Sequence, residues 1–224
     1  MSTLAWFEDT EVGSRTITIA PGQVVFEPET AAKHVYLIQR GEVRLYMSGP
    51  GGACRLVSIV GPGEWFGSAA LAQQETYGMR AVAVSNSTLI EAPLDRMLEV
   101  LERHPQELLE LNRDLAQRLL HATREACSLV FEDCNQRLIN TLVRFSSTAA
   151  SVPHDDGVVL RITHDQLAQA VGVARETVSL ALTQLRQQKL LRTGRNQVVF
   201  NPEALRRLGS QEAAAAQDYA KATV

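Results

Sequence analysis

The chain of 224 residues has few of the features that would assign it to a class at once. It holds only three cysteines, Cys54, Cys127 and Cys134, and no CxxC pair, which argues against a disulfide scaffold and predicts a reduced, cytoplasmic protein. It lacks any run of about 18 uncharged apolar residues, so no membrane span is expected. The first ten residues include Glu8 and Asp9 and no apolar segment after a basic start, so they are not expected to be a signal peptide.

An excess of positive charge is also missing from the chain as a whole. The 22 Lys+Arg and 25 Asp+Glu give a net charge of −3, which is an unpromising average for a nucleic-acid-binding protein. The charge is unevenly distributed, however. Residues 134–210 contain ten basic and five acidic side chains, whereas residues 1–133 contain eleven and eighteen. The positive surplus therefore lies in one C-terminal segment, where contacts to DNA phosphates would need it.

What is present is an ordinary globular composition, with 45% apolar residues, 14 Gly and 8 Pro. From Ser14 to about Pro93, short apolar-alternating runs are separated by Gly and Pro. This pattern predicts an antiparallel sandwich or barrel built from strands and tight turns. The predicted strands are residues 15–19, 23–26, 34–39, 42–46, 54–59 and 87–91.

From Leu94 the apolar period becomes helical, with a short helix over 94–101 and a longer one from Pro105. The longer helix carries a heptad row that is typical of a dimer seam, on which a lone Asn fixes the register. The row is Leu108, Asn112, Leu115, Leu119, Ala122, Ala126 and Leu129. A second apolar row, Leu109, Leu120 and Val130, is expected to face the roll.

The C-terminal segment has the pattern of a winged helix-turn-helix. Asp133 is placed to cap a helix that ends at Phe145, and residues 146–156 look like a linker. Thr163 and Gln166 form a capping box at the start of the next helix. Gly172 then permits the turn into a second helix over 175–188, and a hairpin around 193–196 forms the wing.

An ordinary helical hairpin would explain the spacing of the apolar residues but not the side chains on the outward face of the second helix. That face presents Arg175, Glu176 and Ser179 as candidate base contacts, since Arg can bind guanine bidentately and Glu can accept from cytosine N4. The candidate phosphate contacts are Thr163, Thr177, Thr193, Gly194 and Arg195.

Three motifs carry a family resemblance over about residues 15–208. They are ITHDQLAQAVGVARETVSLALTQLRQQKLL (162–191), YLIQRGEVRL (36–45) and GPGEWFG (61–67). The sequence resembles the cyclic-AMP receptor protein/FNR superfamily of bacterial transcription regulators. The resemblance implies an α+β fold with an N-terminal antiparallel β-roll of the cyclic-nucleotide-binding (jelly-roll) type (1–98), a long dimerisation helix (99–133), a winged-helix domain (134–210) and a flexible tail (211–224).

The resemblance also implies the partners. Family members are homodimers that bind double-stranded DNA at near-palindromic sites, with RNA polymerase as a further partner and activation as a typical outcome. The family's base-reading pattern Arg-Glu-Thr falls on Arg175, Glu176 and Thr177. Leu180 stands where the receptor protein has another base-contacting Arg.

The effector pocket departs from the family pattern. Ser68 follows Gly67 where cyclic-nucleotide binders have a Glu, and Tyr77-Gly78 stands where they have Arg-Ser. On the long helix the positions that meet adenine read Ala122-Thr123. A cyclic phosphate without its Arg would be an unpaired buried charge, so no cyclic-AMP binding and no cofactor are expected. Similar replacements occur in Thermus/Deinococcus-type members, and Arg80 is expected to face away from the pocket by strand alternation.

The sequence lacks the residues that several other chemistries would need. No Cys precedes Cys54, which excludes an FNR-type iron–sulfur cluster, and a lone His34 in the roll cannot form a cupin-type metal site. No metal and no enzymatic activity are therefore expected. Cys127 is expected to be a buried small apolar residue, with a redox role as the alternative. A regulator that responds to a non-standard effector or to redox state remains the alternative function.

Overall fold

The computed structural model describes Phe7 and residues 12–209, and the predicted tail at 211–224 lies outside them. The chain divides into two compact units, residues 1–125 and 126–224, and each is described by itself. The division into domains at 98, 133 and 210 stays a prediction. No helix in the described ranges is long and apolar enough to cross a membrane.

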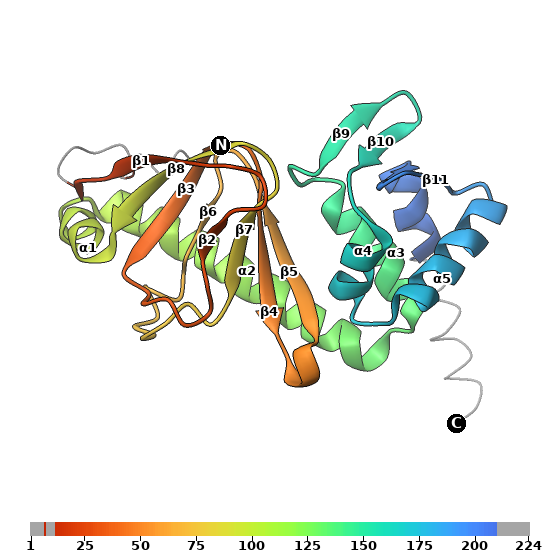
Figure 1. The fold of residues 1–224 in the computed structure, drawn as a ribbon, viewed down its shortest axis with the longest axis horizontal. Coiled ribbons are helices and arrows are strands. Elements are labelled where there is room, and N and C mark those ends of the chain that lie inside the picture. The colour runs from red at the N-terminus through yellow and green to blue at the C-terminus, as the bar shows by residue number, and fades with distance from the viewer. Residues whose placement is uncertain (1–6, 8–11, 210–224) are drawn as a thin grey trace. The chain divides into compact units, whose positions relative to one another are not determined.

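The first unit contains two four-stranded antiparallel sheets, which confirms the predicted roll (Figure 1). One sheet has the order β1-β8-β3-β6, with β1 (Arg15–Ile19), β8 (Ser87–Pro93), β3 (His34–Arg40) and β6 (Trp65–Phe66). The other has the order β2-β7-β4-β5, with β2 (Val24–Phe26), β7 (Arg80–Ala83), β4 (Val43–Ser48) and β5 (Cys54–Val60). A 3-10 turn, η3 (Pro50–Gly52), joins β4 to β5.

All six predicted strands are present, but the sequence did not indicate β6 and β7. The first has only two residues, and the second is half alanine, a residue depleted in strands. Both strands exist because a neighbour pairs with them. Tyr36 and Leu37 pair with β6, and β7 lies between β2 and β4.

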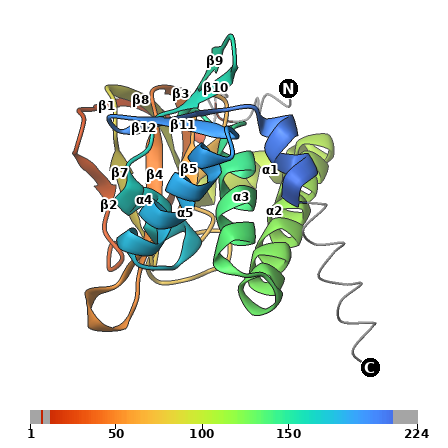
Figure 2. The ribbon, with the colours of Figure 1, turned by 90° about the vertical axis from the view of Figure 1, so that its right-hand side faces the viewer.

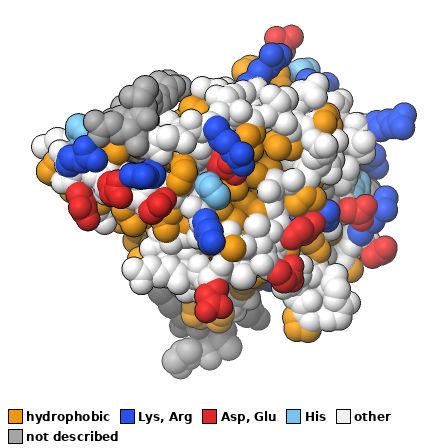
Figure 3. Space-filling model, turned by 60° about the vertical axis from the view of Figure 1, so that its left-hand side comes forward, with side chains coloured by type: hydrophobic (Ala, Val, Ile, Leu, Met, Phe, Trp, Pro, Cys, Tyr) orange, Lys and Arg blue, Asp and Glu red, His pale blue; other side chains and the backbone are white. Residues whose placement is uncertain are grey.

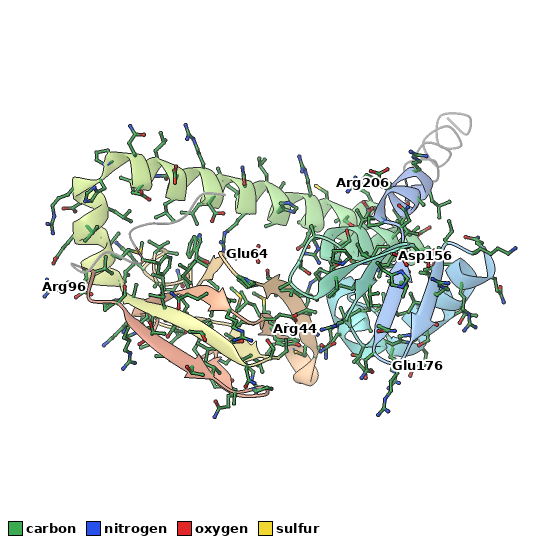
Figure 4. The ribbon with its side chains drawn as sticks, turned by 90° about the horizontal axis from the view of Figure 1, so that it is seen from above. Arg44, Glu64, Arg96, Asp156, Glu176 and Arg206 are labelled. Atoms are coloured by element: carbon green, nitrogen blue, oxygen red, sulfur yellow. The ribbon has the colours of Figure 1, made fainter. Side chains whose placement is uncertain are left out.

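Two helices complete the first unit and lead out of it. They are α1 (Leu94–Arg103) and α2 (Pro105–Phe131), both close to the predicted helices. Figures 1 and 4 show α2 running along one side of the roll. Its last residues, 126–131, belong to the second unit.

The row of α2 that faces the roll was predicted wrongly. Leu120 and Val130 of the predicted row are 58% and 73% exposed, and Leu109 is exposed too. The roll instead contacts Leu111, which is buried, and Leu115, which packs against the roll core.

Polar residues complete that row, which is why counting apolar side chains missed it. Trp65 Nε1 donates to Asp114 Oδ2 at 2.8 Å, and Arg118 Nη2 donates to the Trp65 carbonyl at 2.9 Å. The Arg118 guanidinium also lies 4.2 Å from the centre of the Trp65 ring and pairs with Asp114 at 2.7 Å. Trp65, Asp114 and Arg118 are called the tryptophan clamp below.

The predicted dimer seam lies mostly on the uncovered side of α2. Its leucines Leu108, Leu119 and Leu129 are exposed in the single chain, and so are Asn112, Ala122 and Ala126. Leu115 is the exception, since it packs against the roll.

The second unit contains three helices on one side of a four-stranded antiparallel sheet (Figure 2). The helices are α3 (Cys134–Phe145), α4 (His164–Val171) and α5 (Arg175–Gln187). The sheet order is β11-β12-β10-β9, with β11 (Leu191–Gly194), β12 (Gln197–Phe200), β10 (Gly157–Leu160) and β9 (Ser151–His154). Residues 202–209 are helical.

Two predictions in this unit need correction. The expected linker 146–156 contains β9, an edge strand in which the missing N–H of Pro153 is tolerated. The wing turn is also tighter than expected. Thr193 and Gly194 pair with β12 as part of β11, so that only Arg195 and Asn196, the latter at φ 57°, form the turn.

Leu111→Ala should lower the free energy of unfolding by about 2–5 kcal/mol, because it leaves a cavity between α2 and the roll. The matched control is Leu98→Ala on α1, whose side chain is 41% exposed and should change stability by about 0.5 kcal/mol or less. Urea denaturation followed by tryptophan fluorescence measures both. Equal losses would show that Leu111 does not anchor α2.

Candidate DNA interface and effector pocket

The start of α4 is held by the predicted capping box. Thr163 Oγ1 accepts from the Gln166 N–H at 3.1 Å, and Gln166 Oε1 accepts from the Thr163 N–H at 3.0 Å. The helix ends at Gly172, which has φ 78° and ψ 42° and donates its N–H to the Ala168 carbonyl at 2.8 Å. Only glycine adopts this left-handed conformation at little cost.

The turn places α5 across α4 with a buried contact between them. Leu167 and Ala168 of α4 and Val178 and Leu182 of α5 are all buried. Small Ala168 permits close approach of the two backbones. The opposite side of α5 therefore faces outward, as predicted.

The outward side of α5 presents most of the candidate base contacts. Arg175, Glu176 and Thr177 are exposed, and Figure 4 places Glu176 at the outer edge of this unit. Leu180 is exposed beside them, and Ser179 is partly buried. Arg175 Nη1 lies 3.4 Å from Asp165 Oδ2 on α4, with both side chains more than half exposed. An exposed pair of this kind contributes little, so DNA can replace Asp165 as the partner of Arg175.

Two contacts at this surface were not foreseen from the sequence. One is the Asp165 pairing, and the other is a hydrogen bond of 2.9 Å between His164 Nδ1 and Ser179 Oγ. Both join the first turn of α4 to the outward side of α5. The partners are 10 and 15 residues apart, beyond the reach of any local helix pattern.

The candidate phosphate contacts lie at the start of α4, on α5 and in the wing. Thr163 already serves as a helix cap, while Arg195 is exposed at the tip of the wing next to Thr193 and Gly194 of β11. Alanine at position 174 has no side-chain oxygen for the first-turn N–H groups of α5, which suits them to a phosphate near Thr177. On the face drawn in Figure 3, by contrast, acidic and basic side chains are interspersed.

The pocket positions of the roll are filled by an aromatic side chain. The ring of Tyr77 stacks on Phe26 with 3.7 Å between ring centres, and its hydroxyl donates to the His34 carbonyl at 2.7 Å. Burial raises the pKa of Tyr77 above its ordinary value. The remaining cavity has about 30 Å³ and is bordered by Ser68 and Arg118, among others.

The other predicted pocket positions include Gly67 in the roll and Thr123 on α2. Gly67 has φ +94°, and a Cβ there would lie 3.0 Å from the His34 carbonyl, so the backbone passes too closely for a side chain. Thr123 is exposed on α2 and donates to the Leu119 carbonyl at 2.9 Å. The argument about Arg80 needs correction, because Tyr77 precedes β7 and no common strand relates the two residues. Arg80 pairs with Glu27 at 3.2 Å.

Comparison with known proteins agrees with both parts of this description. Residues 16–104 match the family described as cyclic nucleotide-binding domain, and residues 136–208 match the Crp-like helix-turn-helix domain. The chain is 30% identical to the Cyclic AMP receptor protein of Thermus thermophilus over 82% of each chain. It is 32% identical to the Transcriptional regulator SdrP of the same organism, over 80% of this chain and 86% of that one.

The chain belongs to the CRP/FNR family of transcription regulators. Solved structures agree. The c-di-GMP responsive global regulator CLP of Xanthomonas campestris matches with a TM-score of 0.77 and 25% identity, over 88% of this chain and 98% of that one. A CRP/FNR-family regulator from Thermus thermophilus matches with a TM-score of 0.73 and 28% identity, over 88% and 98%. These relatives are regulators rather than enzymes, as expected.

In this CRP/FNR-family chain, the exposure of Cys127 differs from the expectation. Cys127 is exposed in the single chain, so the prediction of a buried apolar residue was wrong for it. It falls on an outward side of α2 next to the predicted seam residue Ala126. Cys54 is exposed too, and partial burial raises the pKa of the Cys134 thiol. Among the residues that the structure describes, no three His, Cys, Asp or Glu side chains are grouped to hold a metal ion.

Tyr77→Phe should lower the free energy of unfolding by about 1–3 kcal/mol while leaving the pocket filled. The change removes the hydroxyl that donates to the His34 carbonyl and accepts from its N–H at 3.2 Å. Chemical denaturation measures the loss against Tyr46→Phe, whose hydroxyl makes no recorded hydrogen bond in the described part of the chain. A loss no larger than that of the control would contradict the role of this hydroxyl.

Proposed function

We propose that this regulator acts as a homodimer, reads a near-palindromic DNA site with α5, and is not controlled by cyclic AMP. The observation that carries the proposal is the outward side of α5. Helix α4, which begins at the capping box and ends at Gly172, packs against the buried side of α5. Arg175 and Glu176 are exposed at the N-terminal end of α5. This is the end of a recognition helix that contacts base edges in the major groove.

Each side chain has a distinct part in this reading. Arg175 releases Asp165 and binds guanine N7 and O6, and Glu176 accepts from cytosine N4. Ser179 lies one helical turn further along α5 and contacts the next base. Thr163, Thr177, Thr193, Gly194 and Arg195 hold the phosphates on either side, which sets the register but not the sequence.

The homodimer is supported by the uncovered side of α2. Leu108, Leu119 and Leu129 are exposed at heptad-related positions, with Asn112 among them to fix the register. Two copies joined along this row would hold two α5 helices in a twofold arrangement. The twofold symmetry implies an inverted-repeat site, and helix-turn-helix dimers typically bind half-sites about one helical turn of DNA apart.

Independence from cyclic AMP is supported by the packing around Tyr77. A cavity of about 30 Å³ has room for one or two water molecules, whereas small-molecule pockets usually have about 300 Å³ or more. The guanidinium that borders the cavity, that of Arg118, is already engaged by Asp114 and Trp65. A different effector that displaces Tyr77, or oxidation of exposed Cys127, is the alternative means of control.

The further partners follow from the family. We propose RNA polymerase as a partner, activation as the outcome at target promoters, and the cytoplasm as the location. Some relatives carry names such as cAMP-activated global transcriptional regulator, and a structural neighbour is called c-di-GMP responsive.

Selection of binding sites from random double-stranded DNA tests the proposal directly. The purified chain should enrich an inverted repeat, both with and without cell extract. An enriched single half-site would contradict the homodimer, and enrichment only with extract would favour the effector-dependent alternative. Failure to enrich any sequence under either condition would overturn the function.

Arg175→Ala should cost about 1–3 kcal/mol of specific binding and relax the preference at one base pair in each half-site. Arg186→Ala is the matched control, since it removes the same charge from the last turn of α5. A gel-shift series over sites with each base pair replaced measures the discrimination. Unchanged discrimination by the Arg175 variant would refute its assignment.

Cyclic AMP at millimolar concentration should produce no binding isotherm and no change in DNA affinity. The physical reason is that the ring of Tyr77 fills the pocket of the roll. The guanidinium of Arg118, which borders the remaining cavity, is already paired with Asp114. Isothermal titration calorimetry and gel shift measure the two quantities. A saturable isotherm would contradict this expectation and would point to displacement of Tyr77 and recruitment of Arg118.

A further inference from the structure

His164 links the first turn of α4 to the outward side of α5. Its Nδ1 lies 2.9 Å from the hydroxyl of Ser179, and both side chains are partly buried. Asp165, the next residue, makes the parallel contact with Arg175 at 3.4 Å. Two of the three candidate base-reading side chains are therefore held by neighbouring residues of α4 before any DNA is bound.

The two contacts differ in which hydrogen-bonding groups of Arg175 and Ser179 remain available to a base. Arginine has five donors and no acceptor, so its role toward a base is the same whichever partner it has. A serine hydroxyl has one donor and two lone pairs, and alone it can approach donors such as adenine N6 and cytosine N4 or acceptors such as guanine O6 and thymine O4. A free serine at this place would therefore discriminate poorly.

The contact with His164 reduces this ambiguity. If Nδ1 has no proton, it accepts the proton of Ser179, and only the lone pairs of that hydroxyl remain for a base donor. If Nδ1 carries a proton, Ser179 accepts it, and the hydroxyl proton is directed to a base acceptor. In the first arrangement the hydroxyl can only accept from a base. In the second its proton is free for a base acceptor and one lone pair remains, so each arrangement favours a different base group.

We propose that His164 is a specificity-determining residue that acts through Ser179. It does not touch the base, and it sets which base pair is preferred where Ser179 meets the major groove. The inference rests on the proposed DNA-reading function and deepens it. His164 was not among the residues that the sequence pattern selected, because the contact joins positions 15 residues apart on two helices.

A competing role for His164 is a contact to a DNA phosphate through its other ring nitrogen, Nε2. That role would act on every sequence equally, since phosphates carry no base identity. A purely structural link between α4 and α5 would change stability and overall affinity but not the preference at one base pair.

The matched pair His164→Asn and His164→Gln separates these roles. The amide of asparagine falls where Nδ1 lies and reaches Ser179, whereas that of glutamine falls near Nε2 and does not. Both substitutions are neutral and polar. Ser179→Ala removes the hydroxyl from the other side, at a position where alanine favours the helix.

The experiment is competitive binding of the full-length chain to its selected site, with each base pair of a half-site replaced in turn. The unaltered chain should prefer one base pair opposite Ser179 by roughly 3- to 10-fold, the range that one hydrogen bond contributes. His164→Gln and Ser179→Ala should each reduce this preference to less than about 2-fold, and combining them should reduce it no further. His164→Asn should retain it, and the preference read by Arg175 should be unchanged in all variants.

Three results would overturn the inference. One is an intact preference in His164→Gln or Ser179→Ala. Another is a uniform loss of affinity in His164→Gln with a smaller salt dependence, which would identify a phosphate contact. The third is a loss of the base-pair preference in His164→Asn as large as in His164→Gln.

Thermal unfolding of each variant checks folding, and Ser179→Ala remains decisive if a His164 variant is unstable. Failure of the unaltered chain to select any sequence would overturn the proposed function together with this inference.

Discussion

The attachment of α2 to the roll is the constraint from which the uses of that helix follow. Few of its 27 residues are covered in the single chain, and Leu111 is the leucine that the roll buries. The tryptophan clamp supplies the rest of the attachment through two hydrogen bonds, an ion pair and a guanidinium over an indole ring. Because the clamp fixes the rotation of α2 about its axis, Leu108 and Leu119 point away from the roll. The same clamp holds Arg118 at the border of the small cavity beside Tyr77.

The roll has the fold of a cyclic nucleotide-binding domain, and aromatic side chains pack in its interior. The match to the cyclic nucleotide-binding domain covers residues 16–104, and its two sheets are complete. At Gly67 the backbone passes so closely that a side chain would meet the His34 carbonyl. The pocket of the roll is occupied by Tyr77, which is stacked on Phe26 and hydrogen-bonded to β3. Tyr77 therefore stabilises this part of the roll through its stacking and its hydrogen bond.

The second unit separates support from recognition. Apolar residues between α4 and α5 hold the helices together, and the first turn of α4 orients side chains that face outward from α5. The net charge of the chain conceals this arrangement, because the acidic surplus of the first 133 residues outweighs the basic surplus of residues 134–210. The local charge of residues 134–210 is the relevant quantity, because salt screens the field of side chains that lie farther from the DNA than about a Debye length.

Local features could be predicted from the sequence because they depend on residues within a turn or two of one another. The capping box of Thr163 and Gln166, the left-handed Gly172, the Asp133 cap and the six predicted strands all follow from such short-range rules. The outward side of α5 followed as well, since its helical period was clear. Strands β6 and β7 were too short or too rich in alanine to carry a period of their own.

The tertiary structure decided which of several permitted contacts is made. It selected the polar row of α2 over the apolar row that contains Leu120, because Trp65 offers partners to Asp114 and Arg118 that no leucine could satisfy. It also turned Tyr77 into the pocket and brought His164 to Ser179. Each of these contacts joins residues distant in the chain, and its energy depends on geometry that exists only after the elements have packed. The sequence by itself determined the elements and their caps, and packing determined which of their faces meet.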